Sequence, residues 1–202
     1  MSSMSYFVKR LFDIFFSLAL ISFLLPFFFI IALLIIIESH GSPIFIQDRL
    51  GKNGTKFRMY KFRTMVVDAE RIGTGLFSYE NDPRITKIGK YLRLTSLDEL
   101  PQLFNVLFGS MSLVGPRPPV TYELGNYDDL PPIAKCRFLV KPGITGLAQI
   151  AGRNELDWEK KFQFDNLYVE QFSKHGIMLD IYILYKTVLV VVIMKNVVEK
   201  KR

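Results

Sequence analysis

The chain has few of the residues that build disulfides and zinc sites. Among its 202 residues there is one cysteine, Cys136, and there are two histidines, His40 and His175. A single cysteine forms no internal disulfide, and two histidines so far apart do not have the spacing of a zinc site. The composition therefore fits a reducing compartment and gives little support to catalysis centred on histidine.

Charged residues are also scarce. They make up 22% of the chain against 50% hydrophobic residues, and the mean hydropathy is +0.22. This composition excludes a disordered chain, and the length leaves room for one domain with at most an appendage. The net charge is +7, from 26 Lys and Arg against 19 Asp and Glu. A basic chain suits a partner that carries phosphates, which includes nucleic acid, anionic lipid and nucleotides.

A long hydrophobic run lies near the start of the chain. It extends over 27 residues from Leu11 to Ile37, and Asp13, Ser17 and Ser22 interrupt it. As a straight helix it would measure about 40 Å, which exceeds a hydrocarbon core of about 30 Å. Pro26 lies near its middle and is expected to bend it. The pattern alone favours one tilted, kinked transmembrane helix, and the alternative is a re-entrant helix that returns to the leaflet it entered.

The remainder of the chain, residues 41–202, contains no repeat or linker and is interpreted as one domain after a membrane segment at residues 1–40. Two short strands around the turn-forming sequence at 51–54 predict a small β-hairpin. The helical predictions are Leu97 to Phe108, Glu155 to Ser173 and Ile177 to Val198. The last of these is interrupted by charges and ends in basic residues, so we expect an interfacial helix that meets anionic headgroups.

The densest polar signal is the segment from Ser96 to Gln102. One interpretation is a capping box between Ser96 and Glu99, which requires no catalysis. Pro101 complicates that cap, because proline prefers the first helical position, and it places Asp98 and Glu99 just ahead of the helix. Adjacent acids in that position suit an oxygen nucleophile and a ligand for a hard cation such as Mg²⁺.

A carboxylate nucleophile that faces a diphosphate needs cations to offset the repulsion. Basic residues recur in the segments that glycine and proline mark, and one lies five residues before Asp98. Each alone is usually a solvated surface charge, but together they would form a phosphate clamp. The candidates are Lys61, Arg63, Arg93, Arg117 and Arg153.

Two acids interrupt the apolar pattern of predicted helices. Asp165 falls among aromatic positions, where a buried carboxylate requires either an arginine partner or a role in a site. Asp180 shows the same pattern less clearly, because acids at a helix N-terminus are ordinarily caps.

Several ordered blocks make the chain resemble the bacterial sugar transferases known as small monotopic phosphoglycosyl transferases, of the type that starts N-glycan assembly. The resemblance covers nearly the whole chain. The blocks are Lys9-Arg10-x-x-Asp13, Gln47-x-Arg49-x-Gly51, Lys61-Phe62-Arg63-Thr64-Met65, Ser96 through Val106, Met111 through Pro118, Pro142 through Gln149, Gly152-Arg153-Asn154 and Leu179-Asp180.

The resemblance implies an α-rich α+β fold in which a re-entrant membrane helix kinked at Pro26, interfacial helices and the hairpin pack as one membrane-docked domain. It implies a catalytic domain on the cytoplasmic face of the bacterial inner membrane. It also implies the reaction, in which a UDP-sugar gives its phosphosugar to polyprenol (undecaprenyl) phosphate and releases UMP. One departure is Leu25, because several relatives have serine before the proline.

By the same motif matching, Asp98 would be the nucleophile and Glu99 would bind Mg²⁺ beside it. The residues expected to line the site are Lys61, Arg93, Arg117, Arg153 and Asp180. The mechanism expected from these roles has two steps through a phosphosugar on Asp98. A mechanism with Asp98 as general base in a ternary complex is the alternative.

Two other classes of function remain as alternatives. A nucleic-acid binder is disfavoured, because the basic residues are scattered among loops and do not follow one helix face. A non-catalytic membrane scaffold would treat Asp98 and Glu99 as a helix cap.

Overall fold

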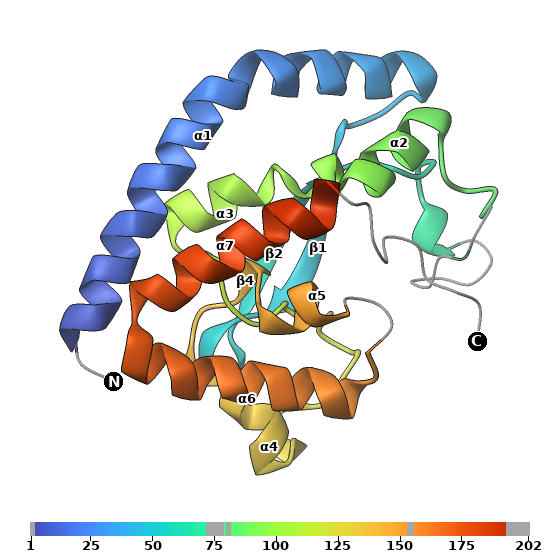
Figure 1. Ribbon diagram of the computed structural model, residues 1–202. Coiled ribbons are helices and arrows are strands. Elements are labelled where there is room, and N and C mark those ends of the chain that lie inside the picture. Colours follow the sequence, from blue (N-terminus) through green and yellow to red (C-terminus); the bar gives the residue numbers. More distant parts are fainter. Residues whose placement is uncertain (1–2, 72–78, 80–81, 153–155, 193–202) are drawn as a thin grey trace.

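The computed structural model describes residues 3–71, 79, 82–152 and 156–192. The fold begins with α1, a helix of 36 residues from Ser3 to Glu38 that contains Pro26. Figure 1 shows α1 as two arms joined at a bend, with the other elements gathered on the inner side of that bend. By length and composition it is the one helix in the described part of the chain that is able to cross a membrane. Only 17% of its most hydrophobic window is buried in the protein.

The other described elements are helical apart from two small sheets. Strands β1 and β2 form one sheet, and β3 and β4 form the other. The α-helices and strands after α1 are β1 (Ile44–Leu50), β2 (Lys56–Phe62), α2 (Lys87–Thr95), α3 (Gln102–Phe108), β3 (Ser112–Val114), α4 (Pro132–Lys135), β4 (Gly143–Thr145), α5 (Leu147–Ala151), α6 (Trp158–His175) and α7 (Ile177–Val192). Short 3-10 turns lie between them at Lys52–Gly54 (η1), Ala69–Arg71 (η2), Leu97–Glu99 (η3), Tyr127–Asp129 (η4) and Cys136–Leu139 (η5).

The predicted hairpin is confirmed. Strands β1 and β2 are antiparallel, with Ile44 opposite Phe62 and Leu50 opposite Lys56. Gly54 closes the turn with φ of +72°, a conformation that favours glycine. The parallel pair β3 and β4 was not predicted, because each strand has only three residues and carries no alternating pattern.

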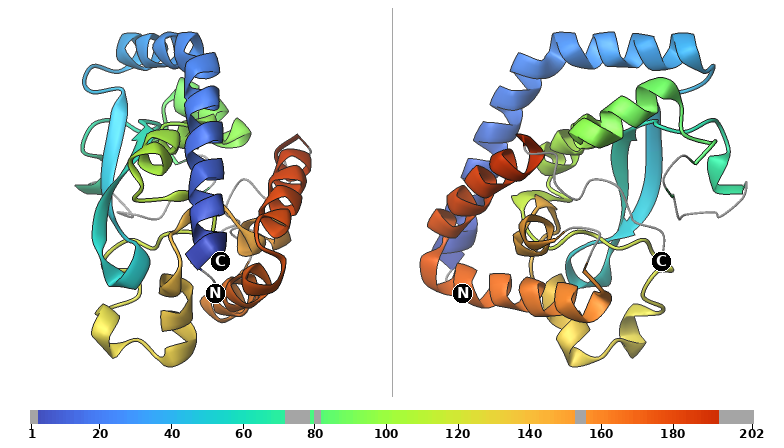
Figure 2. Two further views of the ribbon diagram at one scale, coloured as in Figure 1. Left: turned by 90° about the vertical axis from the view of Figure 1, so that its left-hand side faces the viewer. Right: turned by 45° about the vertical axis from the view of Figure 1, so that its right-hand side comes forward.

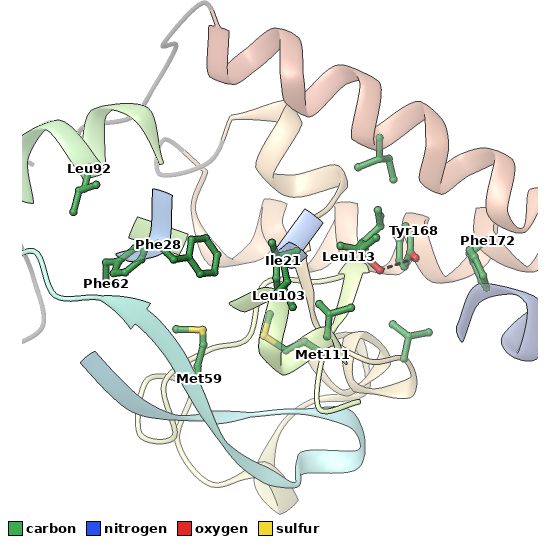
Figure 3. Close-up of a cluster of buried hydrophobic side chains, with 14 of the residues drawn as sticks. Ile21, Phe28, Met59, Phe62, Leu92, Leu103, Met111, Leu113, Tyr168 and Phe172 are labelled. Carbon is green, nitrogen blue, oxygen red and sulfur yellow. Dashed lines mark hydrogen bonds between the residues drawn. The ribbon is translucent and has the colours of Figure 1, made fainter. Parts of the chain in front are cut away.

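The core lies where α1, the hairpin and α3 meet. Phe28 of α1 packs edge-on against Phe62 of β2 with ring centroids 5.6 Å apart. Figure 3 shows Ile21 of α1 beside Leu103 of α3, while Tyr168 and Phe172 of α6 extend the same cluster. The left view of Figure 2 places the N-terminal arm of α1 between the hairpin on one side and α6 and α7 on the other. The hydrophobic cluster therefore joins the N-terminal helix to the rest of the chain.

The N-terminal arm of α1 is tied to the body by polar contacts. The Lys9 ammonium pairs with the carboxylate of Asp180 in α7 and donates to the carbonyl of Val114 at 3.0 Å. Arg10 donates to the carbonyls of Val106 and Leu107 at 2.6 and 2.8 Å, which caps the C-terminal end of α3. These contacts hold the start of α1 against elements more than 90 residues further along the chain.

The C-terminal end of α1 is tied to the same body. The carboxylate of Glu38 accepts hydrogen bonds from the backbone N–H groups of Lys87 and Ile88 at 2.7 and 2.9 Å. A carboxylate at this helix N-terminus is favourable, because these N–H groups have no partner within the helix. Arg63 donates to the backbone carbonyls of Ser39 and His40, where α1 ends. Both ends of α1 thus contact the same body.

The helical predictions differ from the structure mainly at their boundaries. The predicted helix from Leu97 to Phe108 begins as the 3-10 turn η3, and α3 starts only after Pro101. Its proline lacks the N–H that a continuous α-helix would use there. The other two predicted helices are confirmed as α6, which begins at Trp158 and continues to His175, and α7. Glu155 and the part of the last prediction after Val192 lie outside the described residues.

Candidate active site

The two acids lie in a turn between helices. Helix α2 ends at Ser96, whose φ of 58° is left-handed, and η3 follows at once with Asp98 and Glu99. The predicted capping box is wrong, because Ser96 makes no side-chain cap bond and acts as the C-cap of α2. The carboxylate of Glu99 contacts side chains from two other segments, so its position is set by tertiary structure.

Glu99 is held by two cations. Arg117 donates from both terminal nitrogens, at 2.6 Å to Oε1 and 3.2 Å to Oε2, and Lys61 Nζ donates to Oε1 at 2.9 Å. The Glu99 side chain is 13% exposed and that of Lys61 15%, whereas that of Arg117 is 43% exposed. The arrangement leaves a partly accessible guanidinium at the edge of the acid pair.

The environment shifts the pKa of the two acids in opposite directions. Burial by itself would raise the pKa of Glu99, but Arg117 and Lys61 outweigh it and hold that pKa well below its ordinary value. Burial raises the pKa of Asp98, and the neighbouring Lys61 only partly offsets it. Asp98 accepts no hydrogen bond from the described residues, so neither carboxylate oxygen is engaged by a partner there. Asp98 is the more basic and the less constrained of the two acids.

Arg93 completes the group around the acids. Its Nε donates to the hydroxyl of Thr64 at 2.9 Å, and its charge favours the ionised form of Asp98. Helix α2 approaches this part of the chain closely, because Gly89 lies against the Thr64 carbonyl and a Cβ at Gly89 would be 2.0 Å from that oxygen. The structure thus brings Lys61, Arg93 and Arg117 together around the acid pair.

Two of the predicted site residues, Arg63 and Asp180, lie elsewhere in the fold. Arg63 holds the end of α1 through the Ser39 and His40 carbonyls. Asp180 is 1% exposed and binds Lys9 and the hydroxyl of Tyr168. Arg153 lies outside the described residues.

Asp165 has the arginine partner that its position in the helix required. Its carboxylate lies 3.2 Å from Arg137 Nη2, and both side chains are 2% exposed. No pattern along the chain indicated Arg137, which belongs to η5 and is 28 residues from its partner.

Arg49 is a site residue that the analysis of the sequence did not single out. Burial lowers its pKa to about 10, and the next contributor is the charge of Arg117. Its Nη1 donates to the carbonyl of Pro118 at 3.0 Å, beside Arg117. The block Gln47-x-Arg49-x-Gly51 carried the signal that could have found it.

The acid pair fits the way proteins hold magnesium together with a phosphorylated substrate. Mg²⁺ is usually bound by one or two carboxylates and completed by waters and phosphate oxygens. Among the residues that the structure describes, no group of three or more His, Cys, Asp or Glu side chains forms a closed metal cage. Asp98 and Glu99 supply the hard oxygen donors, and Oε2 of Glu99 accepts only one hydrogen bond there, from Arg117.

A family model described as bacterial sugar transferase matches residues 4–194. The chain belongs to the bacterial sugar transferase family. This confirms the resemblance that the sequence blocks indicated. The match extends from the N-terminal arm of α1 to the end of α7, so the long apolar helix is part of the family's sequence pattern.

Named relatives in this family include proteins of several sizes. The chain is 42% identical over 201 residues to a UDP-galactose-lipid carrier transferase of Erwinia amylovora, a match that covers 93% of this chain and 41% of the relative. It is 45% identical over 185 residues to a UDP-glucose:undecaprenyl-phosphate glucose-1-phosphate transferase of Klebsiella pneumoniae, covering 89% of this chain and 39% of the relative. It is 43% identical over 189 residues to the exopolysaccharide production protein PSS of Rhizobium leguminosarum, a match that covers 90% of this chain and 93% of the relative. The chain thus spans about two fifths of the first two relatives and nearly all of the third.

Proposed function

We propose that this protein transfers a sugar phosphate from a UDP-sugar to polyprenol phosphate and releases UMP, which starts the assembly of a membrane-linked glycan. The family and the names of the relatives support the reaction class. The observation that carries the proposal is the acid pair itself. Asp98, whose carboxylate accepts no hydrogen bond from the described residues, adjoins Glu99, which Lys61 and Arg117 hold in place.

In the first step, an oxygen of Asp98 attacks the β-phosphorus of the UDP-sugar. The bond from that phosphorus to the bridging oxygen breaks, UMP leaves with the electron pair, and the phosphosugar stays on Asp98 as an acyl phosphate. The raised pKa of Asp98 makes its carboxylate a better nucleophile once ionised. The partly accessible guanidinium of Arg117 would bind the diphosphate oxygens.

In the second step, a phosphate oxygen of polyprenol phosphate attacks the same phosphorus. The bond to Asp98 breaks, the carboxylate is regenerated, and the product is a polyprenyl diphosphate sugar. Division of the transfer in this way lets a water-soluble donor and a lipid acceptor use one small site in turn. Lys61 and Arg93 would offset the negative charge that both substrates bring.

Asp98 and Glu99 are the residues proposed to hold Mg²⁺. A bound magnesium ion would neutralise part of the charge on the diphosphate. The low pKa of Glu99 keeps that carboxylate ionised and available as a ligand. Because Glu99 is fixed by Arg117 and Lys61, it would stay in place while Asp98 reacts.

The membrane segment is proposed to be re-entrant. Its N-terminal arm is fastened through Lys9 to Asp180, and its C-terminal end is fastened through Glu38 to α2. A helix that crossed the bilayer would have its two ends on opposite sides, whereas both ends here contact the same body. The bend at the middle of α1 would therefore enter the membrane, and both arms would return to one face.

The body is proposed to lie on the cytoplasmic face of the bacterial inner membrane. Residues 41–202 carry the whole net charge of +7, as expected for an internal domain. Helix α7 fits an interfacial position, because it presents a set of exposed apolar side chains. These are Met178, Ile181, Tyr182, Tyr185, Val188 and Leu189.

The decisive experiment measures UMP release by the purified full chain, with undecaprenyl phosphate, magnesium and a panel of UDP-sugars. Release of UMP with at least one sugar, and its loss in Asp98→Asn, is the expected result. A variant Asp98→Asn with near-normal turnover would refute the assignment of the nucleophile. The scaffold alternative predicts no UMP release at all.

The same assay separates the two mechanisms. A covalent phosphosugar on Asp98 predicts one burst of UMP per enzyme without acceptor, together with sugar phosphate trapped on Asp98. A ternary complex with Asp98 as general base predicts no UMP until the lipid is added.

A further inference from the structure

The loop that presents Arg117 is fixed through its carbonyl groups. It contains Pro116, Pro118 and Pro119, which have no backbone N–H to donate. Each carbonyl from 116 to 119 instead accepts a hydrogen bond. Gly143 N–H donates to Pro116 at 2.9 Å and Leu50 N–H donates to Pro119 at 3.1 Å.

The two central carbonyls have side-chain donors. Arg137 Nη2 donates to the carbonyl of Arg117 at 2.5 Å, and Arg49 Nη1 donates to that of Pro118 at 3.0 Å. The bonds to Pro116 and Pro119 come from backbone N–H groups, whereas these two bonds depend on the side chains of Arg137 and Arg49. A substitution of Arg137 or Arg49 would therefore remove a bond to the Arg117 loop, whereas most substitutions at a backbone donor would leave its N–H in place.

Arg137 is itself rigidly held. Asp165 lies 3.2 Å away, and the rings of Phe138, Trp158 and Phe162 surround the guanidinium with centroids at 5.7, 5.1 and 5.7 Å. A guanidinium that is 2% exposed is costly to bury, and apolar residues in its place would often be as stable. Its Nη1 has no hydrogen-bond partner in the described part of the chain. The placement is thus poorly explained by stability and well explained by the bond to Arg117.

We infer that Arg137, held by Asp165, is a positioning residue that sets the place of Arg117 against Glu99. The chain of contacts runs from α6 through Arg137 to the Arg117 backbone, and from the Arg117 guanidinium to Glu99. Arg137 touches neither acid of the pair in this chain of contacts. The expected effect of Arg137 on catalysis rests on the proposed function, in which Arg117 binds the diphosphate.

The test is a double-mutant cycle in UMP release by the full chain, with rates expressed per folded protein. Arg137→Gln in the wild-type background should lower kcat/KM by about ten- to a hundredfold, the range expected when a substrate-binding group is misplaced by about 1 Å. In the Arg117→Lys background the same change should cost less than about threefold, because the side chain it positions is already altered. Equal losses in both backgrounds would overturn the inference.

A matched control is available in Arg84. This guanidinium is also buried, pairs with Asp82 at 2.6 Å and donates to the carbonyl of Ala69 at 2.9 Å. Arg84→Gln should lower stability, and its effect on kcat/KM should be the same with and without Arg117→Lys. If Arg137→Gln does not fold, Arg137→Lys is used in the same cycle. Lysine keeps the charge and N–H donors on a single nitrogen, so Arg137→Lys should retain part of the wild-type rate.

A second cycle needs no activity. If Arg137 keeps Arg117 on Glu99, then Glu99→Gln should lower the free energy of unfolding less in Arg137→Gln protein than in wild type. If Glu99→Gln and Arg137→Gln lower the free energy of unfolding additively, Arg137 does not position Arg117. This outcome can be measured even if the protein releases no UMP. Absence of UMP release by the wild type would count against the proposed function alone, so the two failures are distinguishable.

Discussion

The buried pair of Lys9 and Asp180 gives the sharpest quantitative prediction. Lys9 is 9% exposed at its side chain and Asp180 1%, and the hydroxyl of Tyr168 donates to Asp180 at 2.9 Å. Lys9→Met would remove one charge and leave the other buried without its partner. Loss of one member of a buried pair costs about 3–5 kcal/mol. At this chain length that corresponds to a fall in Tm of about 6–20 °C.

The assay is thermal unfolding of the full chain in detergent or lipid nanodiscs. Asp180→Asn should lower Tm in the same way, and the double variant should lose less than the sum of the two, because neither charge is then left alone. Lys174→Met is the matched control. It breaks an exposed pair with Glu170, whose side chain is 61% exposed, and should cost less than about 1 kcal/mol.

The same variants decide what Asp180 does. If it serves the fold, activity per folded protein in Asp180→Asn should stay close to that of Lys9→Met. If Asp180 instead binds substrate, Asp180→Asn would raise the KM for the UDP-sugar with little change in Tm, and Lys9→Met would not. That second pattern would refute the reasoning from burial and pairing.

Two further predictions concern the membrane and the acid pair. With Cys136 replaced by serine, cysteines placed at the exposed positions Met4 and His40 should react with a membrane-impermeant maleimide from the same side of oriented vesicles. Labelling from opposite sides would contradict re-entry. Lys61→Met should move the acid limb of kcat/KM to higher pH, because Lys61 lowers the pKa of Asp98 and the nucleophile must be ionised. An acid limb that stayed in place, or moved to lower pH, would show that Asp98 does not set it.

Local pattern was sufficient for much of the fold. The hairpin around residues 51–54 and the long apolar helix follow from turn residues and hydrophobic runs, which depend on neighbours in the chain. The adjacent acids Asp98 and Glu99 could also be singled out from their segment alone, since Pro101 indicated that they precede the helix. The prediction of a capping box failed for a tertiary reason, because Glu99 is drawn to Arg117 and Lys61 instead of its own backbone.

The order of residues along the chain was enough to identify those that could carry the chemistry: an acid pair, a set of basic residues in loops marked by glycine and proline, and a helix suited to lipid. Which of these residues contact one another depends on how the elements pack. Lys61 reaches Glu99 across 38 residues, and Lys9 reaches Asp180 across 171. The pair of Lys9 and Asp180 joins α1 to α7, and the Arg137 side chain donates to the backbone carbonyl of Arg117. Such pairings follow from how helices and strands pack and from the cost of an unpaired buried charge, and neither is written in the spacing of residues along the chain.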